Sequence, residues 1–142
     1  MTKPDLVAYK ASRVGARLAR VRSGIVIGPE AFRSREDLIE QVAFNMFLAI
    51  QEAADIASHI VTDEGWGTPA TLAELFTFMQ RNGVIGSETA DAMGRGTRLR
   101  NLIAHAYGDL DPGKLFAAAS AGVGQIERFL AEISAWLAAR TT

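Results

Sequence analysis

Residues 98–109, with the sequence RLRNLIAHAYGD, concentrate side chains that could do chemistry. The segment holds two arginines, an asparagine, a tyrosine and one of the two histidines of the chain. Histidine titrates near neutral pH and can accept or donate a proton during a reaction. The planar guanidinium of arginine carries a permanent charge and matches the oxygens of a phosphate group. This combination favours acid–base chemistry at a phosphate, provided that the surrounding chain positions the two groups.

A helical wheel predicts how these side chains are distributed. Arg98, Asn101 and His105 lie on one flank of an ideal helix, and Arg100 and Tyr107 lie on the other. The apolar face between the flanks is expected to contain Leu99, Leu102, Ile103 and Ala106. Arg100 and His105 are about 140° apart, so they could meet through the reach of the arginine, through distortion at the helix end, or across a two-fold axis. We expect the last arrangement, a composite site at a dimer interface.

Composition limits the classes of protein to which the chain can belong. Its 142 residues suit one domain, and 49% of them are hydrophobic, which predicts a packed core. The net charge of −1 gives no global attraction to nucleic acid or to a membrane surface. The absence of cysteine excludes thiol nucleophiles and disulfides and fits a reducing cytosol. No apolar run is long enough to cross a membrane, and we expect a cytoplasmic protein.

Apolar residues spaced three and four apart predict helices along most of the chain. The expected helices cover residues 4–23, 34–63, 68–82, 87–108, and 112 to about 137. The expected caps are Ser34, Thr68 followed by Pro69, Ser87, and Asp111 followed by Pro112. No segment alternates long enough to be a convincing strand. The sequence therefore predicts an all-α fold, an up-and-down helical bundle of about five helices with one short cross-helix, in a single domain of residues 1–142.

The second of these helices carries more apolar surface than one helix face needs. Phe44, Phe47 and Leu48 lie outside its main apolar stripe, which runs from Leu38 to Ile60. Such a helix must be covered on two sides, by its own domain or by a second subunit.

The residues around Arg100 resemble the Arg-x4-His-x-Tyr signature of the HepT family, within the HEPN superfamily. Here the signature consists of Arg100, Asn101, His105 and Tyr107. The preceding NGVIGSETADAM and the following AYGDLDP resemble the segments that flank the motif in the family, and the helix order is similar over residues 5–138. Arg-x4-His alone is a weak pattern, but with these flanking features it becomes fairly specific.

The resemblance implies a HEPN-like fold and a concrete activity. HepT-like proteins are toxins of two-gene toxin–antitoxin systems that cleave RNA without a metal ion or other cofactor. They act as homodimers, and an MntA-like nucleotidyltransferase antitoxin adds AMP to the motif tyrosine. By position, Arg100 and His105 are the catalytic pair, and Asn101 and Arg98 are supporting polar residues. Tyr107 is then the AMPylation acceptor.

The residue types are compatible with that reaction. RNA carries its own nucleophile, the 2′-hydroxyl, so cleavage needs a proton-transfer group and a cation near the developing phosphorane charge. His105 and Arg100 supply both. An alternative from another class is a non-catalytic HEPN-type helical interaction or nucleotide-binding module that kept the fold and part of the motif. A nucleotidyltransferase gene beside this one would favour the toxin.

Two charged stripes elsewhere have competing interpretations. The acidic one contains Glu52, Asp55, His59 and Asp63. It could hold a metal ion, although a solvated polar face is the commoner use of such a set. The basic one contains Lys10, Arg13, Arg17 and Arg20. It could guide an RNA backbone or serve only solubility.

The glycines of SGIVIGPE lack the lysine of a phosphate-binding loop. Trp66 and Trp136 are expected to anchor the core or an interface.

Overall fold

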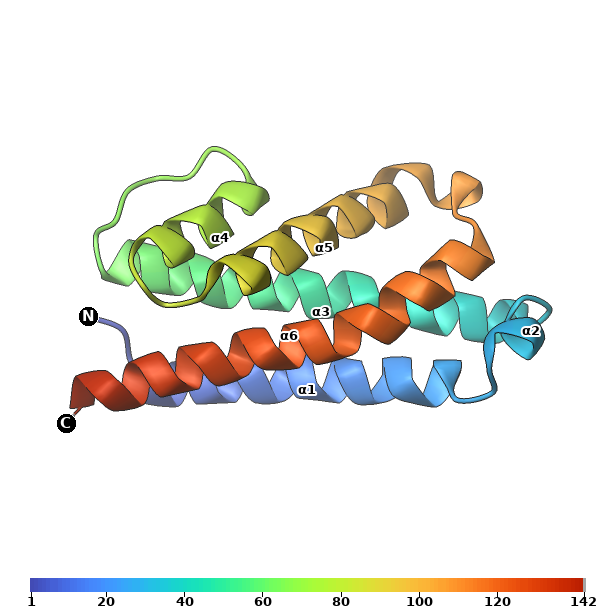
Figure 1. Ribbon diagram of the computed structural model, residues 1–142, viewed down its shortest axis with the longest axis horizontal. Coiled ribbons are helices and arrows are strands. Elements are labelled where there is room, and N and C mark those ends of the chain that lie inside the picture. The colour runs from blue at the N-terminus through green and yellow to red at the C-terminus, as the bar shows by residue number, and fades with distance from the viewer. Residues whose placement is uncertain (142) are drawn as a thin grey trace.

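The computed structural model describes residues 1–141, which form six α-helices, one 3₁₀ turn and no strand. The helices are α1 (Pro4–Ile25), α2 (Pro29–Phe32), α3 (Glu36–Asp63), α4 (Leu72–Arg81), α5 (Ser87–Ala106), η1 (Tyr107–Asp109, the 3₁₀ turn) and α6 (Pro112–Thr141). The long helices α1, α3 and α6 run along the bundle, and α4 and α5 cover α3 from the other side (Figure 1). The predicted all-α bundle with a short extra helix is confirmed. The predicted domain ends at Thr142, which lies outside the described residues.

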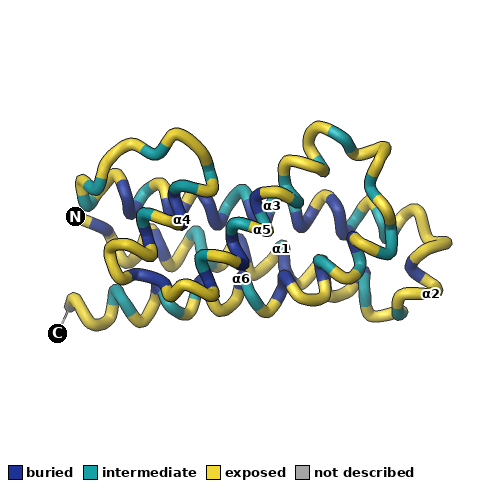
Figure 2. The backbone as a smooth tube through the Cα atoms, turned by 45° about the horizontal axis from the view of Figure 1, so that its top comes forward, coloured by how far each residue is buried: buried dark blue, intermediate teal, exposed yellow. Residues whose placement is uncertain are grey.

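α3 is the central helix of the bundle and packs against α1, α4, α5 and α6. Its buried residues recur at three- and four-residue spacing from Val42 to Val61, and they form the middle of the core (Figure 2). Gly24 allows α1 to approach α3 closely, because a Cβ at this position would lie 2.5 Å from a methyl carbon of Val42. None of the described helices is long and apolar enough to span a bilayer.

Aromatic pairs close the core where α4 and α6 meet their neighbours. Trp66 and Trp136 pack edge to face with ring centroids 5.9 Å apart, and both lie against the core as the sequence predicted. Phe76 and Phe129 form a similar pair at 5.5 Å. The edge-to-face geometry suits the quadrupoles of the rings and fixes α4 and α6 in one packing arrangement.

The glycine-containing break after α1 is confirmed, but it holds a short helix that the sequence pattern did not predict. α1 continues to Ile25, two residues beyond its expected end. Gly28 then adopts a left-handed conformation with φ +92°, which glycine tolerates. Pro29 starts the four-residue α2, consistent with the preference of proline for the first turn.

The start of α3 differs from the prediction, because Ser34 does not cap the helix. Its N–H instead bonds to the carbonyl of Ala31 at 3.2 Å and continues the turn of α2. Arg35 takes the N-cap position and makes no side-chain cap bond. Its guanidinium binds the two carboxylate oxygens of Asp37, at 3.0 and 2.9 Å. Asp37, in the first turn of α3, is therefore paired with a cation as well as with backbone N–H groups of that turn.

The predicted cap of α4 at Thr68 is also wrong. Thr71 caps the helix three residues later, where its hydroxyl accepts the N–H of Glu74 at 3.2 Å. The carboxylate of Glu74 accepts the N–H of Ala70 in return, at 2.5 Å. These two bonds, a variant of the capping box in which the carboxylate reaches the residue before the cap, satisfy two backbone donors and outweigh the preference of Pro69 for a first helical position.

The remaining helix boundaries lie close to the predicted ones. Asn82 and Gly83 end α4 as expected, with Gly83 at φ +76°. Ser87 is the first residue of α5 rather than its cap, and Gly86 takes the N-cap position. The cap of α6 is confirmed, because Asp111 accepts the N–H of Lys114 at 3.0 Å.

Candidate active site

The last turns of α5 leave the core and present the predicted site residues at the surface. Met93 and Thr97 are buried, and no residue of α5 after Thr97 is buried (Figure 2). The helix ends at Ala106 (φ −144°, ψ 40°), and the chain continues as the 3₁₀ turn η1. The predicted end at Gly108 is therefore wrong by two residues, and Tyr107 stands at the junction of α5 and η1.

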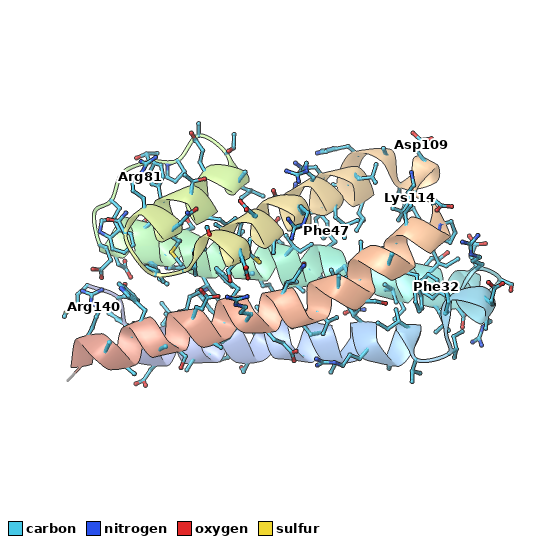
Figure 3. All side chains as sticks on the ribbon, viewed as in Figure 1. Phe32, Phe47, Arg81, Asp109, Lys114 and Arg140 are labelled. Atoms are coloured by element: carbon cyan, nitrogen blue, oxygen red, sulfur yellow. The ribbon has the colours of Figure 1, made fainter. Side chains whose placement is uncertain are left out.

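Arg100 makes three contacts with uncharged groups, two of them on α3 and one on α5 itself. Its Nε–H donates to Oε1 of Gln51 at 2.9 Å, and its Nη1 donates to Oδ1 of Asn101 at 3.0 Å. The guanidinium carbon lies 5.0 Å from the ring centroid of Phe47, within the range of a cation–π contact. Figure 3 labels Phe47 where α5 passes over α3. The arginine is half-buried and its direction is fixed.

The opposite flank of α5 is exposed. Arg98, Asn101 and His105 are all exposed, as the helical wheel predicted for one shared flank. Leu102, which the wheel places on the apolar face, is 40% exposed and borders this flank. Leu99 and Ile103 do pack against the core. The polar flank of the motif is therefore bordered by an exposed apolar residue.

Arg100 and His105 do not meet within one chain. Among residues 1–141, no hydrogen bond or ion pair joins the two side chains, and the ring of His105 has no charged partner. The arginine turns toward α3, whereas the histidine stays on the exposed flank. The separation that the wheel predicted is thus present in the folded chain.

Tyr107 lies on the α3 side of the motif, beside two acidic residues. Its ring is 41% exposed. Partial burial raises the pKa of the Tyr107 hydroxyl, and the nearby carboxylates of Glu40 and Glu36 raise this pKa further. Tyr107 and Arg100 therefore face the same stripe of α3, on which Glu36 and Glu40 interact with the tyrosine and Phe47 and Gln51 contact the arginine.

The two charged stripes outside the motif pair with each other. Lys10 contacts Asp55 at 2.6 Å, and Arg13 and Arg17 approach the same oxygen of Glu52 at 3.4 and 3.7 Å. His59 lies 3.9 Å from Asp55. No group of three possible metal ligands occurs among residues 1–141. The stripes form an ion-paired seam between α1 and α3, so most of the basic stripe already has acidic partners.

Sequence reasoning missed the residues of α3 that hold the motif. No motif in the sequence marks Gln51, and the apolar pattern predicts Phe47 only as apolar surface. The available signal was the order Glu40, Phe44, Phe47, Gln51, which places two aromatic rings between polar side chains on one helical stripe. Deciding that this stripe faces α5 requires the helix packing, which the sequence alone does not supply.

Solved structures with the same fold define the class of protein. The chain superposes on the tri-AMPylated HEPN toxin of Shewanella oneidensis, solved in complex with an MNT antitoxin, with a TM-score of 0.86. The match covers 94% of this chain and 99% of that toxin at 22% sequence identity. A chain of a toxin–antitoxin complex crystallised with AMP-PNP also gives a TM-score of 0.86, at 21% identity and with 92% and 98% of the two chains covered. The fold is that of HEPN proteins.

Sequence comparison places the chain within one family of this class. The family described as "Ribonuclease HepT-like" matches residues 16–133, and the chain belongs to it. The tRNA nuclease HepT of Aphanizomenon flos-aquae is 30% identical over 90 residues, which span 63% of this chain and 61% of that protein. The mRNA nuclease HepT of Shewanella oneidensis is 24% identical over 107 residues, or 75% and 80% of the two lengths.

Proposed function

We propose that this chain is the toxin of a HepT/MntA-type toxin–antitoxin system and acts as a metal-independent endoribonuclease. The observation that carries the proposal is the intact Arg100-x4-His105-x-Tyr107 motif at the exposed end of α5, in a member of the ribonuclease HepT-like family. The relatives named as tRNA and mRNA nucleases support RNA as the class of substrate. We place the activity in the cytoplasm, where such RNAs occur.

In this proposal the 2′-hydroxyl of RNA attacks the adjacent phosphorus, and the 5′-oxygen of the next nucleotide leaves. His105 moves a proton in this step, either from the 2′-hydroxyl or to the 5′-oxygen, because imidazole titrates near neutral pH. Arg100 stabilises the charge that develops on the phosphate oxygens. Asn101 keeps the guanidinium in place by accepting from Nη1, and Arg98 adds positive charge on the flank of His105.

The site is completed across a homodimer interface in this proposal. Leu102 is 40% exposed beside His105, and Phe44 of α3 is 59% exposed. Exposed apolar side chains beside a polar motif favour burial against a second subunit. A two-fold axis there would bring Arg100 of one protomer near His105 of its partner. Light scattering at micromolar concentration should give the mass of a dimer, and a monomer would contradict the composite site.

Tyr107 is the proposed acceptor of AMP from an MntA-like nucleotidyltransferase. The HEPN toxin with the matching fold that is described as tri-AMPylated supports this assignment. An adenylyl phosphate on Tyr107 would be repelled by Glu40 and Glu36 and attracted by Arg100 along the same stripe of α3. It would then occupy the position that an RNA phosphate needs, and modification would silence the enzyme.

The test of the modification uses the two tyrosines of the chain. Coexpression with an active cognate nucleotidyltransferase should add adenylyl groups to wild-type protein and to Tyr9→Phe, but not to Tyr107→Phe. The Tyr107→Phe variant should retain RNA cleavage and escape silencing by modification. An unmodified Tyr107 after coexpression, or full cleavage by the modified protein, would refute this part of the proposal.

The test of the activity uses the two histidines. Wild-type protein and His59→Ala should cleave RNA at similar rates in EDTA, because neither metal nor the α1–α3 seam takes part. His105→Ala should lose about 10²- to 10⁴-fold, the usual cost of removing a proton-transfer group. Equal cleavage by His105→Ala and wild type would overturn the assignment. Loss of cleavage in EDTA with recovery in manganese would overturn the metal-independent mechanism.

A further inference from the structure

The guanidinium of Arg100 has a defined set of occupied and unoccupied donors. Arginine has five N–H donors. Gln51 takes the one on Nε, and Asn101 takes one of the two on Nη1. No residue among 1–141 accepts from Nη2. Three donors, all at the Nη1–Nη2 end of the group, therefore remain for a ligand, whereas side-on binding through Nε is blocked.

The partners that hold Arg100 leave its charge uncompensated. Two other arginines of the chain also lie over aromatic rings, Arg140 over Trp136 at 4.4 Å and Arg81 over Phe78 at 5.3 Å. Arg140 is paired with the carboxylate of Glu64 at 2.7 Å, which offsets its charge. Arg100 instead combines an aromatic contact with two hydrogen bonds to neutral amides.

Half-burying an arginine without an acidic partner costs free energy of folding. A purely structural role for Arg100 does not explain why the fold accepts this penalty. Partial removal from water disfavours the charge, and a carboxylate at the position of Gln51 would offset that penalty. A neutral amide fixes the direction of the side chain but leaves the full positive charge for an incoming anion. The arrangement is suited to presenting the cation rather than to joining α5 to α3.

We propose that Gln51 and Phe47 are positioning residues for RNA cleavage. Together they fix Arg100 so that its Nη1–Nη2 end faces the RNA phosphate. This inference rests on the proposed function, because it assumes that Arg100 stabilises the phosphate charge. Gln51 sets the direction by occupying Nε–H, and Phe47 supports one face of the guanidinium. Neither residue touches RNA, and both act through Arg100.

The central variant is Gln51→Leu, with Gln125→Leu, at a half-buried glutamine of α6, as the matched control. Misplacing a group that acts at the reacting centre can cost about 100-fold in rate, so we expect Gln51→Leu to lower kcat about 10- to 100-fold. KM should change by less than about threefold, because RNA affinity is spread over many phosphate contacts. Gln125→Leu should cleave like wild type.

A second readout follows the arginine directly and does not depend on activity. In wild-type protein the Nε–H of Arg100 should exchange slowly with water in NMR spectra, because Gln51 accepts it. Gln51→Leu should remove this protection while the rest of the spectrum stays folded. Phe47→Leu keeps apolar volume but removes the aromatic face, so it should lower kcat less than Gln51→Leu and leave the Nε–H bond in place.

A double-mutant comparison separates positioning from an unrelated structural effect. In an Arg100→Ala background, Gln51→Leu should cause no further loss of cleavage. The same fold-loss in both backgrounds would overturn the inference, as would retained Nε–H protection in Gln51→Leu. In either of these cases Arg100→Ala by itself still cleaves roughly 100- to 1,000-fold more slowly than wild type, and the proposed function stands. Wild-type cleavage by Arg100→Ala would instead overturn the catalytic assignment together with the inference drawn from it.

Discussion

Gln51 and Glu52 are neighbours on α3, yet they face different arginines with opposite consequences. The carboxylate of Glu52 faces α1, where it lies 3.4 Å from Arg13 and 3.7 Å from Arg17. The amide of Gln51 faces α5 and accepts from Arg100 at 2.9 Å. The α1 arginines have their charge offset by an acid, whereas Arg100 keeps its charge. We expect this difference to decide which of these arginines can act on a phosphate.

The two histidines repeat this contrast. His59 lies 3.9 Å from Asp55 within the ion-paired seam between α1 and α3. His105 is exposed at the end of α5 and has no acidic partner among the described residues. Residue types are thus nearly the same in the two regions. Their partners differ, and we therefore expect the seam to serve packing and the end of α5 to carry the proposed chemistry.

The largest expected difference in RNA cleavage between the two regions comes from replacing one arginine of each region with alanine. Arg100→Ala should lower the rate of RNA cleavage by roughly 100- to 1,000-fold, the cost of removing a group that stabilises developing charge. Arg13→Ala should stay within about twofold, because only its surface contacts with Tyr9 and Glu52 are lost. Initial rates on one RNA substrate measure both. Comparable losses would remove the distinction between the regions.

The sequence predicted the helices and the motif, because both depend on local spacing. The 3.6-residue period determined which side chains of α5 share a flank, and Arg98, Asn101 and His105 are exposed together as expected. The caps at Ser34 and Thr68 were wrong because Ser34 continues the turn of α2, and because Glu74 takes the N–H of Ala70 that a cap at Thr68 would need. Such competition between local motifs is hard to decide from residue types alone.

The partners of the charged stripes could not be predicted from the sequence. Each stripe was recognised on its own helix, but pairing them requires the rotation of α1 and α3 about their axes. The same holds for Gln51 and Phe47, which reach Arg100 only because α5 lies over that stripe of α3. These contacts depend on how the helices pack against one another, and no local sequence pattern encodes them.

A smaller effect should follow from neutralising the acid of the seam. Glu52→Gln removes the carboxylate that faces Arg13 and Arg17, and we expect a loss of about 1 kcal/mol in the free energy of unfolding. RNA cleavage should not change. Urea unfolding measures the first quantity. A loss of cleavage without a change in stability would show that the seam takes part in the reaction.

The smallest expected effect concerns the titration of Tyr107. Burial and the carboxylates of Glu40 and Glu36 raise its pKa, so the folded state favours the neutral phenol. That preference is fully present below the pKa of the unfolded chain and is lost as the pH rises through the folded pKa. Glu40→Gln should lower the pKa of Tyr107, as measured by phenolate absorbance in a Tyr9→Phe background. Glu88→Gln should leave it unchanged, and an equal shift in both would contradict the assignment.

The most direct test of the contrast between the regions is to give Arg100 the partner that the α1 arginines have. Gln51→Glu keeps the acceptor for Nε–H and the shape of the side chain but adds one negative charge. Arg100 should stay in place, with its Nε–H still protected, and RNA cleavage should fall about tenfold, whereas Gln125→Glu should not change it. Unchanged cleavage by Gln51→Glu with the Nε–H bond intact would contradict the account, because the uncompensated charge of Arg100 would then have no role.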